Sequence, residues 1–482
     1  MKKKIIELMA FALVTAVLVL GVSYAIADRE TTFSAVYSEP DNSVDVVIVG
    51  SSHVNSGYIP SMLWEENNLS AVNAFSWSQP MWVSYHYIVE ALKTQSPDYI
   101  VLEMYGMVYG HSYIMPQEID KTSYNNSFNL LPSWNRWQLI KTSEFCGLDL
   151  RNAQDFLYIS RYHTRWKTFD WSYLSYNPTK QHDYLKGYGY LTNAAGIQTP
   201  SVELSNEEIV PYEYCVEYLD KIVKLCEEKG IELIFTLTPY VYQTEETAVL
   251  NWLERYSNEK GIPFFNYLYG EDYERIGFDY STDLADTGHC NYNGAVKITQ
   301  DLCTYLDSVG ASVPTQQEHP FYRMLSEDYS KFERVPALNV IMESSDIESF
   351  VQNAVNDKDV TLFINTYSAD ESILDKLNGI LNPNNEPTDY NMEDMIITAG
   401  EIANPAGSVK FEMFGKNGTV EFAQESCEIY LNGTAVPGGT VSDIKIVLFD
   451  NVLQRPVMSV WLEDGIMKTK EFTSDIIDNY KV

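Results

Sequence analysis

Apolar runs alternate with amphipathic runs along the first two thirds of the chain. The run at 44–49 is rich in β-branched residues, which is typical of a parallel strand buried on both faces. Runs at 97–105, 231–239 and 262–268 predict further strands, and the segments between them favour helices. Strands separated by helices form βαβ units, so we predict an α/β protein with a doubly wound parallel sheet.

The pattern changes at two later places. Residues from about 110 to 205 form an insertion rich in Trp and Tyr, for which substrate contacts and plain aromatic packing are both open. Residues 311–335 form a polar connector. Short, partly alternating runs in 336–482 predict a smaller β-rich α+β accessory domain. We therefore expect the α/β domain to occupy 42–310.

Residues 1–30 have the pattern of a signal anchor or a signal peptide. Three lysines precede a stretch from 5 to 27 that is apolar except for Glu7. As a helix these residues would span about 34 Å, enough for a bilayer core, and the lysines favour an extracytoplasmic location for everything after Asp28. Ala25-Ile26-Ala27 also resembles a signal-peptidase site, so secretion after cleavage stays open. The length of the span favours an uncleaved anchor in the cell membrane.

The charge and the cysteines narrow the function classes. The chain has 33 basic and 67 acidic residues and a net charge of −34, which excludes nucleic acid as a partner because phosphate contacts need a basic face. Six cysteines among 482 residues are too few for a disulfide scaffold, and no CxxC or Cys/His spacing predicts a zinc site. We expect neither a metal nor an organic cofactor.

A possible catalytic set lies at the carboxyl edge of the predicted sheet. The first predicted strand ends in Gly-Ser-Ser-His, which includes Ser52, and the sequence Asp-Thr-Gly-His, from Asp286 to His289, follows the last predicted strand. Ligands of open α/β sheets bind at this edge. A carboxylate at this spacing can hold Nδ1–H of His289 and leave Nε2 facing Ser52. Ser52 would then be a nucleophile, although a serine that only caps the following turn is the alternative.

These motifs resemble those of the SGNH (GDSL-like) serine hydrolases. Ser52 matches the nucleophile of the first block, and Asp286 and His289 match the Asp-x-x-His block. The resemblance implies a flavodoxin-like SGNH fold, with His289 as base and Asp286 as the residue that orients it.

The segment Val-Asn-Ala-Phe-Ser-Trp-Ser-Gln-Pro resembles the second block of the family. Asn73 matches its asparagine, and Ser78 stands where the oxyanion glycine is expected. The resemblance implies an oxyanion hole made by Ser52, Ser78 and Asn73. The third block, Gly-x-Asn-Asp, is absent, and Leu-Glu-Met-Tyr-Gly-Met stands near its place. Its absence removes one oxyanion donor.

These departures from the family pattern, together with the N-terminal apolar stretch, are similar to those of exported, membrane-tethered members of the family. Such members serve D-alanylation of teichoic acid and O-acetylation of alginate. This likeness implies a serine esterase or O-acyltransferase acting on an acylated cell-surface polysaccharide, with a membrane-bound acyltransferase as a possible partner. The alternative is a non-catalytic protein that binds glycans or serves cell-envelope assembly. The C-terminal region resembles the interleukin-like EMT-inducer domain, which implies glycan binding.

Several further residues have both a functional and a structural interpretation. His53, Gln79, His163 and Arg165 are candidate substrate contacts. For Gln79, His163 and Arg165 a turn, packing or surface role is equally open, whereas for His53 a structural role is favoured. Glu103 follows an apolar strand and would have a raised pKa if it faced a pocket, but a surface or salt-bridged position is the alternative.

Overall fold

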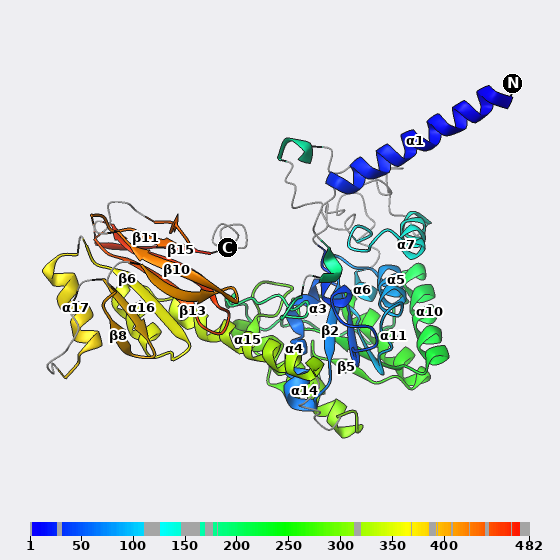
Figure 1. The fold of residues 1–482 in the computed structure, drawn as a ribbon. Helices are drawn as coiled ribbons and strands as arrows, with labels where there is room; N and C mark the ends of the chain where they lie inside the picture. Colours follow the sequence, from blue (N-terminus) through cyan, green and yellow to red (C-terminus); the bar gives the residue numbers. More distant parts are fainter. Residues whose placement is uncertain are drawn as a thin grey trace. The chain divides into compact units, whose positions relative to one another are not determined.

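A computed structural model gives the structure of the chain (Figure 1). It describes residues 2–26, 31–109, 126–145, 164–168, 177–180, 182–312, 320–367, 369–384, 392, 394–405, 408–423, 425–438, 443–463 and 465–472. The chain divides into two compact units, Met1–Tyr329 and Ser330–Val482, which we describe separately.

The first unit contains a five-stranded parallel sheet. Its strands are β1 (Val46–Gly50), β2 (Ala71–Phe75), β3 (Tyr99–Glu103), β4 (Glu232–Leu237) and β5 (Phe264–Asn266), in the spatial order β2-β1-β3-β4-β5. This is the flavodoxin-like order, and it confirms the predicted doubly wound parallel sheet. The order reverses between β1 and β3, so the carboxyl ends of these two strands flank the place where such folds bind ligands.

Strand β2 was not predicted. Asn73 interrupts its short apolar run, and asparagine is depleted in strands. The side chain is tolerated because its amide group donates hydrogen bonds to two backbone carbonyls, as described below.

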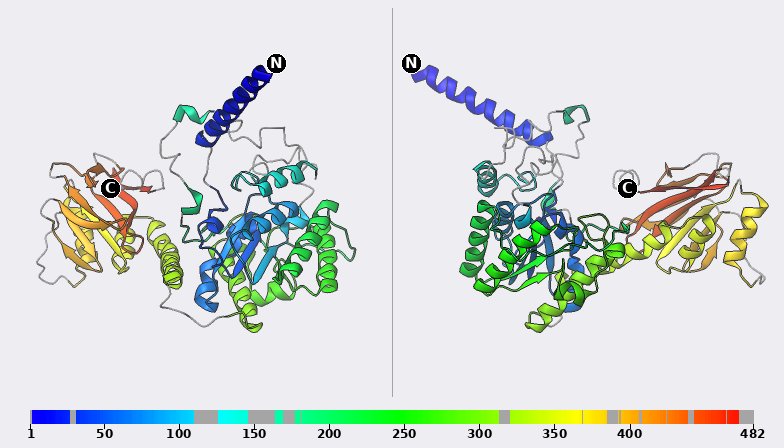
Figure 2. Two further views of the ribbon diagram at one scale, coloured as in Figure 1. Left: turned by 45° about the vertical axis from the view of Figure 1, so that its right-hand side comes forward. Right: turned by 180° about the vertical axis from the view of Figure 1, so that it is seen from behind.

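Helices cover both faces of the sheet (Figures 1 and 2). One layer contains α5 (Met81–Ala91), α10 (Glu213–Lys229) and α11 (Thr244–Lys260), and the other contains α3 (Ser52–Gly57), α4 (Pro60–Asn67) and α14 (Tyr292–Ser308). Further helices of this unit are α2 (Ser34–Tyr37), α6 (Tyr105–Val108), α7 (Trp134–Phe145), η4 (Arg165–Thr168), η5 (Pro178–Lys180), α12 (Glu271–Ile276) and α13 (Tyr280–Asp283). Helix α10 ends at Gly230, whose φ of 70° suits a C-cap.

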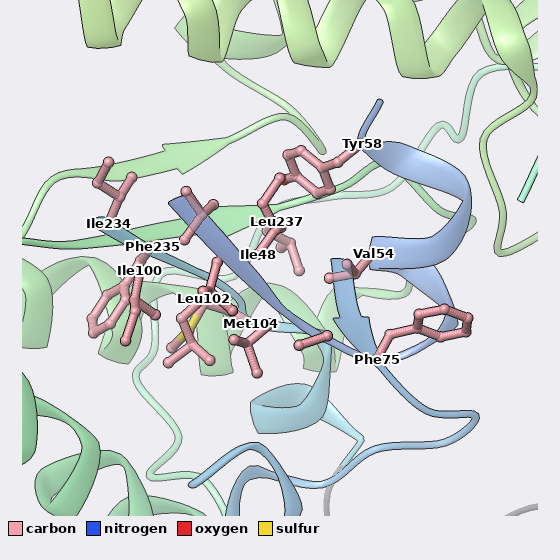
Figure 3. Packing of buried hydrophobic residues seen from close by; sticks show 14 of the residues in the cluster. Ile48, Val54, Tyr58, Phe75, Ile100, Leu102, Met104, Ile234, Phe235 and Leu237 are labelled. Atoms are coloured by element: carbon pink, nitrogen blue, oxygen red, sulfur yellow. The ribbon is translucent and has the colours of Figure 1, made fainter. Parts of the chain in front are cut away.

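The core of this unit lies between the sheet and its two helical layers (Figure 3). Every residue of β1 and β2 is buried, which explains the β-branched run in β1. Ile48, Leu102 and Phe235 come from three different strands and belong to one buried cluster. A sheet buried on both faces fixes the register of its strands, and it therefore fixes the positions of the residues at their carboxyl ends.

A buried charge cluster joins three distant segments of the first unit. Nζ of Lys186 lies 2.5 Å from Oε1 of Glu39 and 2.9 Å from Oδ2 of Asp328, and each of these side chains is at most 2% exposed. Nε2 of His182 lies 2.7 Å from Oδ1 of Asp328. A buried ammonium group is tolerated because it is paired in this way.

The helix α15 (Pro320–Met342) contains the boundary between the two units. Part of the connector expected at 311–335 is therefore helical. Leu325, Phe332 and Leu338 are buried, and their spacing of six or seven residues places them along one side of a helix.

The second unit is the smaller β-rich domain predicted for the C-terminal part. One sheet has the order β15-β14-β13-β6-β7-β8, a second has the order β12-β11-β10-β9, and the neighbouring strands are antiparallel. The elements are α16 (Ile347–Val355), β6 (Val360–Asn365), α17 (Glu371–Leu381), β7 (Met395–Thr398), β8 (Glu401–Ala403), β9 (Val409–Met413), β10 (Lys416–Phe422), β11 (Ile429–Leu431), β12 (Thr434–Ala435), β13 (Lys445–Asp450), β14 (Arg455–Glu463) and β15 (Ile466–Glu471).

The N-terminal apolar stretch is helical, as expected, in α1 (Lys2–Ile26). Within Lys3–Ile26, the most apolar 18-residue window has a mean hydropathy of 2.6 and none of it is buried, whereas Ser23 and Ile26 near the end of the helix are buried. The helix is long and apolar enough to cross a membrane, which fits both a single-pass anchor and a signal sequence.

Candidate active site

Ser52 stands directly after the turn that follows β1. Ser51 is the N-cap of α3, and its Oγ accepts a hydrogen bond from the His53 N–H at 3.4 Å. Ser51 therefore has the capping role that was the alternative for Ser52. Gly50 permits this tight turn, because a Cβ there would lie 2.7 Å from Cγ2 of Val54 and 2.8 Å from Cβ of Glu103.

The structure brings Ser52, His289 and Asp286 together. Oγ of Ser52 lies 2.8 Å from Nε2 of His289, although 237 positions separate the two residues. Nδ1 of His289 lies 2.9 Å from both carboxylate oxygens of Asp286. In this arrangement Nδ1–H donates to the carboxylate, and the lone pair of Nε2 faces the serine hydroxyl.

Backbone contacts fix the loop that carries Asp286 and His289. Oδ1 of Asp286 accepts hydrogen bonds from the N–H groups of Gly288 at 2.7 Å and His289 at 3.0 Å. The N–H of Val241, in the loop after β4, donates to the carbonyl of Thr287 at 2.8 Å. These bonds keep the imidazole on the carboxyl edge of the sheet.

The Asp286 carboxylate is suited to orient and stabilise a charged imidazole. Partial burial acts to raise its pKa, but hydrogen bonds from Gly288 N–H and from His289 outweigh it and hold the pKa below its usual value. The side chain of Asp286 is 58% exposed, against 31% for His289. Asp286 is therefore ionised at neutral pH, and its carboxylate accepts the hydrogen bond that orients the imidazole ring of His289.

Cys290 follows His289 but points into the core. The side chain is 1% exposed, and its burial raises the pKa of the thiol. Because the thiolate is the reactive form, Cys290 is unsuited to act as a nucleophile.

The buried ring of His53 lies beside the triad. Its Nδ1 lies 2.8 Å from Oγ1 of Thr238, and its ring stacks on that of Tyr105 with 3.8 Å between the centroids. The ring centroid lies 5.5 Å from that of His289. Burial, and then the neighbouring His289, lower the pKa of His53 well below its usual value, so the ring is neutral.

Three tyrosines, Tyr105, Tyr109 and Tyr240, form an aromatic cluster with His53. The sequence analysis did not single them out. Tyr105 stacks on Tyr109 with 4.6 Å between centroids, and it meets Tyr240 edge to face at 5.0 Å. Tyr105 and Tyr109 follow β3, where the third SGNH block is absent. The aromatic residues at this position were the available signal, but only the fold shows that they lie beside His53.

Asn73 makes contacts that differ from the oxyanion role implied by the resemblance. The residue is fully buried in β2, and its Nδ2 donates to the carbonyls of Val54 at 3.2 Å and Tyr58 at 2.9 Å. Both amide hydrogens are thus used to hold the segment after Ser52 against the sheet. We assign Asn73 a positioning role because an oxyanion contact would require breaking one of these bonds.

Ser78 and Gln79 lie in the turn after β2. Ser78 has a φ of 50°, in the left-handed region that glycine adopts most readily. Gln79 is 1% exposed. Its Oε1 accepts from Oγ of Ser76 at 2.8 Å, and its Nε2 donates to Oγ of Ser84 at 3.1 Å. Its amide therefore stabilises the turn.

Glu103 ends β3 and is neither on the surface nor salt-bridged within the described residues. It is 1% exposed, and burial raises its pKa to about 8, opposed by hydrogen bonds from Tyr105 and Thr238. The Tyr105 N–H donates to Oε1 at 3.2 Å. Glu103 is therefore mostly protonated at neutral pH, next to the Gly50 turn.

The other two candidate substrate contacts belong to the aromatic insertion. Arg165 begins η4 and is half-buried, outside the contacts of the triad just described. His163 lies outside the described residues. Their role as substrate contacts stays a prediction.

The described part of the chain contains no group of three or more His, Cys, Asp or Glu side chains placed to hold a metal ion. The side chains that converge on the site are those of Ser52, His289, Asp286 and His53. This set is suited to nucleophilic and acid–base chemistry.

No protein-family model and no curated protein sequence matches the chain. Among solved structures, a protein from Bacteroides fragilis described as an acylhydrolase is similar at 11% identity and a TM-score of 0.30, covering 58% of this chain and 95% of its own. A GDSL-like lipase from Bacteroides thetaiotaomicron is similar at 10% identity and a TM-score of 0.27, covering 60% and 96%. Both TM-scores are below 0.5, so these likenesses bear on neither the fold nor the activity of this chain.

Proposed function

We propose that the protein is a serine esterase or O-acyltransferase with Ser52 as nucleophile, His289 as general base and Asp286 as the residue that orients the base. The observation that carries this proposal is the continuous contact from Oγ of Ser52 to Nε2 of His289 at 2.8 Å, and from Nδ1 to Asp286 at 2.9 Å. Acyl transfer through an acyl-enzyme needs these three groups in this order.

The reaction has two halves. Oγ of Ser52 attacks the acyl carbonyl carbon while its proton moves to Nε2 of His289, which gives a tetrahedral oxyanion. The imidazolium then protonates the leaving alcohol oxygen, and the carbon–oxygen bond of the ester breaks. In the second half, His289 takes a proton from water or from a sugar hydroxyl, whose oxygen attacks the acyl-enzyme. The serine oxygen leaves with the proton, and a free acid or a new ester is released.

The backbone N–H groups of Ser52 and Ser78 are the proposed oxyanion donors. The left-handed φ of Ser78 supports its place in this role. Each such donor typically contributes about 3 kcal/mol to binding of the transition state. Asn73 is left out because its amide hydrogens are bonded to Val54 and Tyr58.

The proposed substrate is a cell-surface polysaccharide that carries acetyl groups. Aromatic side chains stack well on sugar rings, and the half-buried Tyr109 is the outer member of the stack that runs from His53 through Tyr105. The three lysines at the start of α1 favour a single-pass anchor with the catalytic unit outside the cytoplasm. A membrane-bound acyltransferase is the proposed partner, and the second unit is proposed to bind glycan.

One observation favours a second candidate function, a non-catalytic protein that binds glycans or assembles the cell envelope. No asparagine stands after β3, where Glu103 and Met104 occupy the place of the missing third block. With Asn73 also committed to structure, the oxyanion hole has no side-chain amide from either block. A site of this kind could retain a substrate without efficient turnover.

The two functions are distinguished by labelling the full-length protein with a fluorophosphonate probe, which reacts with activated serines. Labelling should be lost in Ser52→Ala and in His289→Ala, and it should persist in the matched control Ser51→Ala. An unlabelled, folded wild type would contradict the esterase proposal and favour the binding function.

A further inference from the structure

The segment that follows α1 is fixed to the body of the first unit. Oγ1 of Thr31 donates to the carbonyl of Asn129 at 2.5 Å, and Oγ1 of Thr32 donates to the carbonyl of Phe75 at 2.6 Å. Phe33 is fully buried and meets the ring of Tyr87 edge to face at 5.1 Å. The chain is therefore attached within six residues of the end of α1.

The attachment point is on the catalytic edge of the sheet. Phe75 is the last residue of β2, and Figure 3 labels it together with Val54 of α3 in the same buried cluster. Phe75 pairs with Gly50 on the neighbouring strand, and Gly50 precedes Ser52 by two residues. Thr32 is thus tied next to the strand end that carries the nucleophile.

Chain length then limits the distance between α1 and the nucleophile. Six residue steps from Ile26 to Thr32 reach at most about 22 Å. With neighbouring strands about 4.8 Å apart, the Cα of Ser52 lies no more than about 40 Å from the Cα of Ile26. The carboxyl edge that carries Ser52 is consequently held within about 40 Å of the end of any membrane span that α1 forms.

Exposed tryptophans lie close to the same attachment. Trp77 follows Phe75 by two residues and is 40% exposed. Trp134 follows Asn129 by five residues, is 70% exposed and stacks on Trp137 with 4.5 Å between the ring centroids. Tryptophan is enriched where proteins meet the headgroup region of a bilayer, because its ring is apolar and its N–H is polar.

We infer that the catalytic edge of the sheet, with Trp77 and Trp134, lies against the surface of the membrane that α1 spans, and that the site acts on esters of membrane-anchored molecules. The substrate part of this inference rests on the proposed function. The docking part rests only on the attachment of Thr32, the length of α1 and the exposed tryptophans.

The docking part is tested by photo-crosslinking in lipid vesicles that hold the full-length protein. Benzoylphenylalanine is placed at position 77, 134 or 258, of which the last is an exposed asparagine near the end of α11, the end remote from the carboxyl edge. Positions 77 and 134 should crosslink to lipid at least fivefold more than position 258. Equal crosslinking at all three positions would overturn the docking of this edge, whatever the activity of the protein.

The substrate part is tested in the same vesicles with one chromogenic acetyl ester, prepared with and without a lipid anchor. A flexible 20-residue Gly/Ser insertion between Ala27 and Asp28 adds a mean reach of about 25 Å. It should lower turnover of the anchored ester several-fold and leave that of the soluble ester unchanged. The same insertion before Lys2 is the matched control and should change neither.

The two failures are distinguishable. Unchanged turnover of the anchored ester after the insertion would overturn the substrate inference. If the wild type turned over neither ester but positions 77 and 134 still crosslinked to lipid, the proposed esterase function would be contradicted and the docking of the edge supported.

Discussion

Oγ of Ser52 and Nε2 of His289 lie 2.8 Å apart at the carboxyl edge of the parallel sheet, although the two residues are 237 positions apart in the sequence. Ser52 follows β1, and His289 lies in the loop between α13 and α14. A contact of this length allows direct proton transfer between the two side chains.

Replacing Asp286 by asparagine should lower kcat for ester hydrolysis on the order of 10³- to 10⁴-fold. The amide cannot hold the imidazole in the required tautomer or stabilise its charge. Asp279→Asn is the matched control, since that carboxylate caps α13 and should leave kcat unchanged. Steady-state kinetics with a soluble acetyl ester measures both. A loss of less than tenfold for Asp286→Asn would contradict its role.

Replacing Asn73 by alanine should destabilise the fold by about 2–3 kcal/mol. The carbonyls of Val54 and Tyr58 would lose their donor while they remain buried. Urea unfolding measures the change. A variant with wild-type stability and a strongly reduced kcat would instead indicate an oxyanion donor and contradict the positioning role.

The buried Glu103 should make stability depend on pH. Its pKa is about 8 when folded and near 4.5 when unfolded, so between these values the folded state keeps a proton that the unfolded state releases. The stability contribution is full below about pH 4.5 and is lost as pH rises through 8. Glu103→Gln removes this dependence. As pH rises from 4.5 to 8, the free energy of unfolding of the variant should therefore increase relative to that of wild type by up to about 1.4 kcal/mol per pH unit. If the free energies of unfolding of wild type and variant changed in parallel with pH, the raised pKa of Glu103 would be contradicted.

Replacing Gly50 by alanine should destabilise the protein by about 1–3 kcal/mol, because the new Cβ would overlap Val54 and Glu103. Gly379→Ala is the control. Gly379 lies in α17 with no heavy atom within 4 Å of an added Cβ, so this change should stabilise the helix by about 0.5–1 kcal/mol. Thermal unfolding of both variants checks the pair, and a Gly50→Ala protein as stable as wild type would contradict the steric argument.

The sequence pattern was sufficient for the sheet class and for the candidate triad. Four of the five strands of the first unit are apolar runs bounded by turn residues, and Ser52 and His289 follow such runs. β2 was missed because a buried asparagine is read as a turn residue until its hydrogen-bond partners are known. The role of Asn73 could not be predicted for the same reason.

The aromatic cluster around His53 could not be predicted from the sequence, for a different reason. Tyr105 and Tyr240 are 135 positions apart, and nothing in the local pattern around either residue indicates the other. Their meeting depends on the order of β3 and β4 in the sheet, which is a property of the whole fold. The connector at 311–335 was judged by its polar composition, whereas its few buried apolar residues are those that determine the helix.

The Lys186 cluster determines where the first unit can be divided. A fragment that ends at residue 310, the limit expected from the sequence, keeps Lys186 and Glu39 but lacks Asp328. One of the two carboxylates around a buried ammonium group would then be missing, and the surface covered by the first turns of α15 would be open to water. The smallest self-sufficient fragment of the first unit therefore extends past Asp328, and a shorter one should be recovered as aggregate.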